Sequence, residues 1–235
     1  MREGHHRVLG SVLDVRRAAE LAHSVGAKLL LDGCQAVPRL TVDVAALDCD
    51  FYAFSRHKLY GPTGIGALWS KHLDAMPPWQ GGGAMIERVT FEKTAFAAPP
   101  QRFEAGTPAI VEAIGLAAAC DYVTSIGLDA IHAHEAGLVA QLREALRGMN
   151  DVTLFGPEDS AGLVSFAIRG VHPHDLGTIL DEDDVAIRAG HHCAQPLMGH
   201  LGVDATARAS FGLYSDEDDI AALLRGIDRT KRIFA

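Results

Sequence analysis

Two short apolar runs, each ending in polar residues, constrain the fold of this chain most strongly. Residues 28–31 give a strand pattern that stops at Asp32, and residues 51–55 give a second strand pattern that leads into Lys58. Open α/β sheets bind their ligands at the carboxyl ends of their strands. The sequence therefore predicts two strands whose ends share a polar crevice.

The remaining periodicity predicts further helices and strands in an α/β or α+β arrangement. Helices are expected at residues 12–25, at 110–149 with an interruption near Gly127, at 174–181 and after a capping box at 215–218. Further strands are expected at residues 64–70, 152–155, 163–168 and 185–187. An irregular loop separates the two halves up to about residue 108, which favours a domain boundary near residue 120.

Composition and charge exclude several classes of protein. The 235 residues carry 21 basic and 30 acidic side chains, a net charge of −9, and the basic residues are scattered. Nucleic-acid binding needs a basic face, so such a partner is not expected. No apolar run approaches the roughly 20 residues of a membrane span, and the first residues lack a secretory signal. A soluble cytoplasmic protein is expected.

The four cysteines show no disulfide or metal-binding spacing, which indicates reduced thiols. Cys49 and Cys120 lie in segments that are expected to belong to the hydrophobic core. The Cys34 side chain is expected to pack against its neighbours rather than to act as a nucleophile. Cys193 is different, because it follows a predicted strand and a glycine and has Arg188 and two histidines nearby. Cationic neighbours favour a nucleophilic thiolate. The alternatives are a buried thiol, or a zinc site formed with His191, His192 and His200.

A carboxylate, an amine, a hydroxyl and an imidazole gather at the predicted strand ends. These groups belong to Asp32, Lys58, Ser55 and His57. Pyridoxal phosphate (PLP) needs such a set, with a lysine for a Schiff base, an acid for the pyridine nitrogen and donors for the phosphate. The alternative is that Lys58 is a surface lysine and Asp32 a helix cap.

Four motifs resemble those of the class V aminotransferase fold, in particular the SUF-type cysteine desulfurases and selenocysteine lyases. They occupy residues 31–38, 48–66, 102–108 and 188–198, in the family's order, and the resemblance runs from about Val8 to the C-terminus. It implies a partial large domain of the PLP-dependent transferases (fold type I) over residues 1–120. A small α+β domain carrying the cysteine loop would follow at 121–235.

The resemblance also implies residue roles. Lys58 would hold PLP as a Schiff base and Asp32 would face the pyridine nitrogen. The other cofactor contacts would be Gln35 on the phenolic oxygen, Ser55 and His57 on the phosphate, and Thr107 on the phosphate of a dimer partner. Arg208 and Arg188 would bind the substrate, Cys193 would accept sulfur, and no metal is implied.

The implied activity is removal of sulfur from L-cysteine, which gives L-alanine and an enzyme persulfide for iron–sulfur cluster assembly. A homodimer and a sulfur-acceptor protein are the implied partners. Selenocysteine lyase activity on L-selenocysteine is one alternative. A non-catalytic remnant that dimerises or binds an acceptor is the other.

Two features depart from the family pattern. Arg56 stands where family members usually carry glycine, and its large cation would either clash with the phosphate donors or add a phosphate contact. The family's N-terminal half has no counterpart in the sequence, which predicts a truncated chain or a separately encoded N-terminal fragment. We therefore expect weak cofactor binding and self-association of the chain alone.

Overall fold

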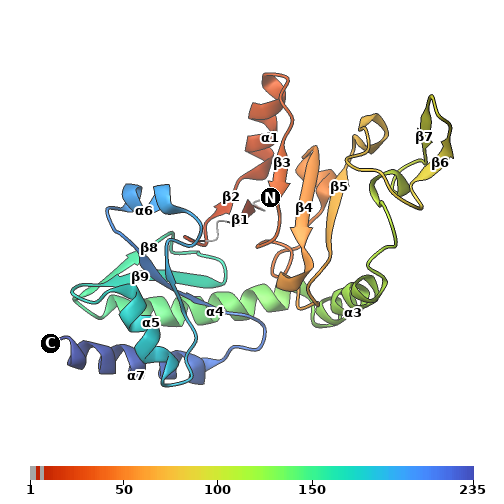
Figure 1. The fold of residues 1–235 in the computed structure, drawn as a ribbon. Coiled ribbons are helices and arrows are strands. Elements are labelled where there is room, and N and C mark those ends of the chain that lie inside the picture. The colour runs from red at the N-terminus through yellow and green to blue at the C-terminus, as the bar shows by residue number, and fades with distance from the viewer. Residues whose placement is uncertain (1–3, 6–7) are drawn as a thin grey trace. The chain divides into compact units, whose positions relative to one another are not determined.

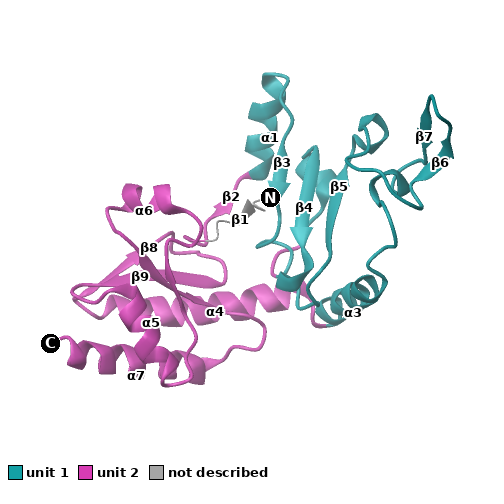
Figure 2. Ribbon diagram, in the orientation of Figure 1, with its two compact units in different colours: residues 1, 15–38, 42–125 teal, residues 2–14, 39–41, 126–235 magenta. Residues whose placement is uncertain are grey.

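The computed structural model describes residues 4–5 and 8–235, which form two compact units (Figures 1 and 2). The first unit contains residues 15–38 and 42–125. The second contains residues 39–41 and 126–235, together with the described residues up to 14. The sequence-based division at residues 120 and 121 stays a prediction.

A three-stranded sheet in the order β3-β4-β5 organises the first unit. β3 (Leu30–Asp32) and β4 (Phe51–Ser55) are parallel, whereas β5 (Gly66–Ser70) is antiparallel to β4. The strand predicted at 51–55 matches β4, and those predicted at 28–31 and 64–70 are displaced by one or two residues. The parallel pair places Asp32 and Ser55 at corresponding strand ends, as predicted.

Two helices pack beside this sheet. α1 (Val15–Ser24) places Val15 in a small core with residues of β3, β4 and α2. α2 (Val44–Leu47) is capped by Asp43, whose carboxylate accepts hydrogen bonds from the amides of Ala45 and Ala46. The small core of the first unit contains Val15, Leu31, Leu47, Cys49 and Tyr52.

The segment predicted as irregular loop contains short ordered elements. A hairpin of β6 (Ile86–Val89) and β7 (Thr94–Phe96) lies between the single turns η2 (Leu73–Ala75) and η3 (Gln101–Phe103). α3 (Ile110–Ile126) follows, and it is apolar around its circumference with few buried residues. Ile114 is 68% exposed, and Cys120 is exposed as well, so the prediction that Cys120 lies in a core is wrong in this structure.

A four-stranded antiparallel sheet in the order β10-β11-β9-β8 forms the second unit. Its strands are β8 (Val152–Phe155), β9 (Leu163–Ile168), β10 (Arg188–Gly190) and β11 (Thr206–Ser210). α4 (Leu128–Arg147) contacts β8 and β9, and α5 (Pro173–Asp181) contacts β10 and β11. α7 (Glu217–Ile233) lies against both helices, and Leu142, Phe166, Leu180 and Ile227 lie in the shared core. A hairpin of β1 (Gly4–His5) and β2 (Val12–Leu13) belongs to the same unit.

Some sequence-based assignments in the second unit need correction. The edge strand is at 188–190 instead of 185–187, and α6 (Gln195–Leu201) and β11 were not predicted. The cap of α7 is Asp216, paired with Asp219, so the capping box lies one residue later than predicted. α5 ends at Asp181, and Arg229 of α7 pairs with Glu182 and Asp183, which follow that end.

A buried ion pair attaches residues 39–41 to the second unit. Nε of Arg39 lies 3.1 Å from Oε2 of Glu135, which is fully buried on α4. Arg39 also donates to the carbonyl oxygen of Ala161. The close approach leaves no room for a side chain at Gly162, where a Cβ would lie 2.6 Å from both Arg39 and Glu135.

No single helix in the described part of the chain is long and apolar enough to cross a membrane. α3 and α4 taken together pass that test by length and composition only.

Candidate active site

The turn after β3 brings a carboxylate and a thiol together. The Asp32 carboxylate accepts a hydrogen bond of 3.0 Å from the Cys34 amide. Gly33 lies so close to the ring of Tyr52 that a Cβ there would collide with it. Burial raises the pKa of the Cys34 thiol, Asp32 adds to the rise, and Lys58 opposes it. Asp32 and Lys58 therefore both lie within electrostatic range of the Cys34 thiol.

The second strand end carries the donors predicted for a phosphate. Ser55 Oγ lies 3.1 Å from Nδ1 of His57, and Lys58 ends the single turn η1 (Arg56–Lys58). Gln35 is half-buried in the turn after β3, and Thr107 is exposed in the loop before α3.

This arrangement fits PLP. Asp32 ends β3, Lys58 lies on the turn after the parallel neighbour β4, and both influence the same Cys34 thiol. The hydroxyl of Ser55 and the imidazole of His57 already lie within hydrogen-bond distance of each other, as two donors to one phosphate would. The residues present can therefore hold the cofactor, and their individual roles stay predictions.

The predicted nucleophile lies on a loop of the second unit. After β10, the chain passes through His192 and Cys193, which both have positive φ angles, 54° and 59°. Non-glycine residues rarely adopt this conformation, and two in succession mark a strained loop of the kind found at functional sites. The exposed Sγ of Cys193 accepts a hydrogen bond of 3.4 Å from Nη2 of Arg188.

A second arginine lies beside the first. Arg188 and Arg208 are directly opposed in the antiparallel pair of β10 and β11. Like charges in opposed positions are unfavourable unless an anion compensates them. The pair therefore suits a carboxylate ligand, for which guanidinium groups provide matching donors.

His192 attaches this loop to β11 through hydrogen-bond contacts with Thr206. It is buried, and its Nε2 lies 3.1 Å from the carbonyl oxygen and 2.8 Å from Oγ1 of Thr206. Burial, and after it the charge of Arg208, lowers the pKa of His192 to about 4, so the ring is neutral. No feature of the sequence pattern predicts this role for His192. Among the described residues no three His, Cys, Asp or Glu side chains are placed to hold a metal ion.

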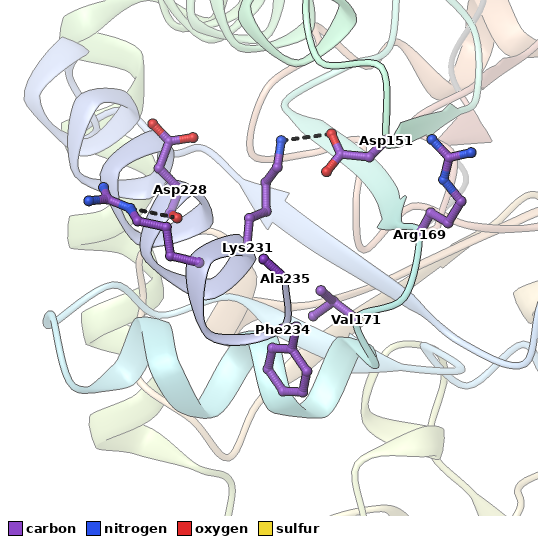
Figure 3. A pocket seen from close by; sticks show the side chains of 8 residues that line it. Asp151, Arg169, Val171, Asp228, Lys231, Phe234 and Ala235 are labelled. Atoms are coloured by element: carbon purple, nitrogen blue, oxygen red, sulfur yellow. Dashed lines mark hydrogen bonds and ion pairs between the residues drawn. The ribbon is translucent and has the colours of Figure 1, made fainter.

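A cavity of about 500 Å³ at the end of α7 contains none of the predicted site residues (Figure 3). Its cationic side chains have partners within the protein. Lys231 bonds Asp151 over 2.7 Å, Arg169 donates to the carbonyl of Asn150, and Arg232 donates to the carbonyl of Asp228. With its cations engaged, this cavity is a feature of the surface rather than a second candidate site.

Comparison with known proteins identifies the family. Residues 4–223 match the family described as Aminotransferase class-V, so the chain belongs to it. A cysteine desulfurase of Dickeya dadantii is 50% identical over 229 residues, covering 96% of this chain and 56% of that protein. The chain therefore spans little more than half the length of the relatives it matches.

Solved structures agree with this assignment. The cysteine desulfurase CsdA of Escherichia coli superimposes with a TM-score of 0.94 at 40% identity, covering 98% of this chain and 58% of CsdA. A mutant of the cystine C-S lyase C-DES, solved with glycine covalently linked to the PLP cofactor, gives a TM-score of 0.80 at 25% identity; 94% of this chain and 58% of C-DES are covered. These matches confirm the predicted resemblance, the α/β fold class and the partial fold-type I domain.

Proposed function

We propose that this chain provides the catalytic groups of a PLP-dependent cysteine desulfurase, which converts L-cysteine to L-alanine. The observation that carries the proposal is the hydrogen bond from Arg188 to the exposed thiol of Cys193. A cation in contact with sulfur stabilises the negative charge that a nucleophilic thiolate needs. The similarity to cysteine desulfurases over nearly the whole chain supports the same activity.

Residues of the first unit would hold the cofactor. Lys58 would form the covalent attachment, Asp32 would face the pyridine nitrogen and Gln35 would bond the phenolic oxygen. Ser55 and His57 would donate to the phosphate, and Thr107 would contact the phosphate of a second copy in a homodimer. When bound, PLP supplies the electron sink that lets the bond between the substrate's β-carbon and its sulfur break.

Residues of the second unit would handle the substrate and its sulfur. Arg208 and Arg188 would bind the substrate carboxylate. The sulfur of Cys193 forms a bond to the substrate sulfur while the carbon–sulfur bond breaks. The carbon keeps the electron pair and takes up a proton, so it becomes the methyl group of alanine. Cys193 is left as a persulfide, and atoms and electrons balance without an external oxidant.

The fate of the persulfide sulfur extends the proposal. A sulfur-acceptor protein would take it for iron–sulfur cluster assembly, in the cytoplasm. Because the chain matches about 56% of the length of its relatives, the remaining part of the fold would come from further sequence or from a separate polypeptide.

The test measures alanine and persulfide formed from L-cysteine by the natural protein. Cys193→Ala should abolish both products and leave cofactor absorbance unchanged. Cys34→Ala is the matched control, since it removes a half-buried thiol beside the cofactor residues. Equal loss of sulfur transfer in the two variants, or alanine formation without Cys193, would overturn the proposal.

A further inference from the structure

Arg56 is the least expected side chain in the first unit. It is 0% exposed and begins the turn that carries His57 and Lys58. None of its Nε, Nη1 and Nη2 atoms has a hydrogen-bond partner among the described residues. An arginine stays charged under all ordinary conditions, so this is a buried positive charge.

Two glycines create the space that the side chain occupies. A Cβ at Gly61 would lie 2.5 Å from Nε of Arg56, and a Cβ at Gly115 on α3 would collide with Nη2. Pro62 lies against Gly115 at the same place. The side chain therefore runs from η1 across the following turn to α3, and its position is fixed by backbone on both sides.

A buried charge without a counter-ion is costly, by several kcal/mol. The cost falls when an anion binds close by, because charges interact strongly where water is excluded. Ser55 and His57, which flank Arg56 in the chain, are the donors that fit a phosphate. A cation whose backbone lies between these donors, and whose side chain is already held in place, attracts an anion to the turn without having to reorganise.

We propose that Arg56 is a positioning residue whose buried charge gives the turn at residues 55–58 its affinity for an anionic group. This inference rests on the proposed function in one respect, namely that the anion is the phosphate of PLP. Arg56 needs no direct contact with that phosphate, since it acts through the turn and through its charge.

The first experiment tests the placement of the side chain without any cofactor. Gly115→Ala should lower the thermal unfolding midpoint by several degrees in the natural protein. In an Arg56→Gly background the same change should lower the midpoint by much less, because of the close contacts of the added Cβ only those with Pro62 would remain. Gly137→Ala is the matched control, because it lies within helix α4 with open space around its Cα, and its effect should not depend on Arg56. Additive effects of Arg56→Gly and Gly115→Ala would overturn the inferred placement.

The second experiment tests the charge. Binding of PLP and of pyridoxal, which lacks the phosphate, is measured by absorbance for the natural protein, Arg56→Met and Arg56→Lys. Arg56→Met should reduce the ratio of PLP to pyridoxal affinity tenfold or more, and Arg56→Lys should restore most of it. A purely structural role would weaken both ligands equally, and that result would overturn the proposal.

Inorganic phosphate separates the two proposals. It should raise the unfolding midpoint of the natural protein at constant ionic strength, and it should fail to do so with Arg56→Met. If the natural protein responds to phosphate but binds neither PLP nor pyridoxal, the proposed function fails and the role of Arg56 stands. If phosphate has the same effect on the natural protein and on Arg56→Met, or no effect on either, the role of Arg56 is refuted.

Discussion

Arg188 lies directly opposite Arg208 in the antiparallel pair of β10 and β11, and the same Arg188 donates to Sγ of Cys193. One guanidinium can therefore act on the nucleophile while the two together present donors for an anion. Strand register produces this arrangement, since a slip of one residue would turn Arg188 to the other face of the sheet.

Replacing Arg188 by Met should slow alkylation of Cys193 by iodoacetamide at neutral pH. Losing about 1 kcal/mol of charge stabilisation at an exposed site corresponds to about a fivefold lower rate. Peptide mass spectrometry gives the rate at each cysteine, with the exposed Cys120 as internal reference. Arg225→Met, an exposed change on α7, is the control and should leave the rate unchanged. An unaltered rate in Arg188→Met would show that the hydrogen bond does not activate the thiol.

Borohydride reduction in the presence of PLP should label Lys58. The competing lysines near the sheet are already engaged, Lys71 with Asp48 over 2.9 Å and Lys28 with His72 over 2.9 Å. Peptide mapping identifies the labelled residue, and Lys58→Ala should lose the label. A label on Lys28 or Lys71 would contradict the assignment.

Asp50 should make the first unit sensitive to acid. Its carboxylate is 2.7 Å from Nε2 of His72 and 2.9 Å from Nε2 of His23, and it accepts a hydrogen bond from the Leu29 amide. The His72 contact, followed by the Leu29 amide, holds the pKa of Asp50 well below its usual range, while Lys28 and Lys71 lie within 4 Å.

This lowered pKa makes the stability of the first unit depend on pH. Because the folded pKa is below the unfolded value of about 3.9, the stabilisation is complete above that value and is lost progressively as the pH falls from there towards the folded pKa. The free energy of unfolding should drop more steeply between about pH 5 and pH 3 in the natural protein than in Asp50→Asn. Denaturant titrations at each pH measure this, with the exposed Asp74→Asn as control. Parallel pH profiles for the natural protein and Asp50→Asn would rule out the network.

Asp216→Ala should destabilise α7 by about 1 kcal/mol, because the side chain accepts hydrogen bonds from the amides of Asp218 and Asp219. Asp218→Ala removes the same charge from the first turn without removing the cap and should cost less. Chemical denaturation compares the two, and equal losses would mean that the cap contributes only its charge.

The chain alone should associate through α3. Val111 and Ile114 are exposed apolar residues on this helix, and contiguous apolar surface of this kind is uncommon on monomers. Val111→Lys together with Ile114→Lys should shift the sedimentation profile towards the monomer. The matched pair Arg16→Lys and Arg17→Lys on α1 should not change it. A monomeric natural chain would refute the expectation.

The sequence predicted those parts of the fold that depend on local pattern. β4 and β9 have the predicted bounds because their apolar runs coincide with the residues that pair. β10 was misplaced because Arg188 and Gly190 pair with Arg208 and Thr206, a register that apolar periodicity does not encode.

In the candidate site too, local sequence pattern does not encode contacts between distant segments. Motif resemblance found Lys58, Asp32 and Cys193, but the burial of Arg56 depends on Gly115, which lies 59 residues further along the chain. Likewise, nothing in the sequence pattern indicated that His192 would turn inward to Thr206. Contacts between distant segments decide both cases.

The ion pair of Arg39 and Glu135 joins two segments of the second unit that are far apart in the sequence, so no single continuous stretch of the gene encodes this unit. A segment encoding residues 126–235 alone would leave the Glu135 carboxylate buried without its guanidinium, and Ser165 without the carbonyl of Val8 to which it donates. Recombination at residue 126 would therefore transfer a second unit that lacks the partners of Glu135 and Ser165 and is less stable for that reason. An exchange of this unit between homologues therefore has to include residues 39–41 and the N-terminal segment that contains Val8.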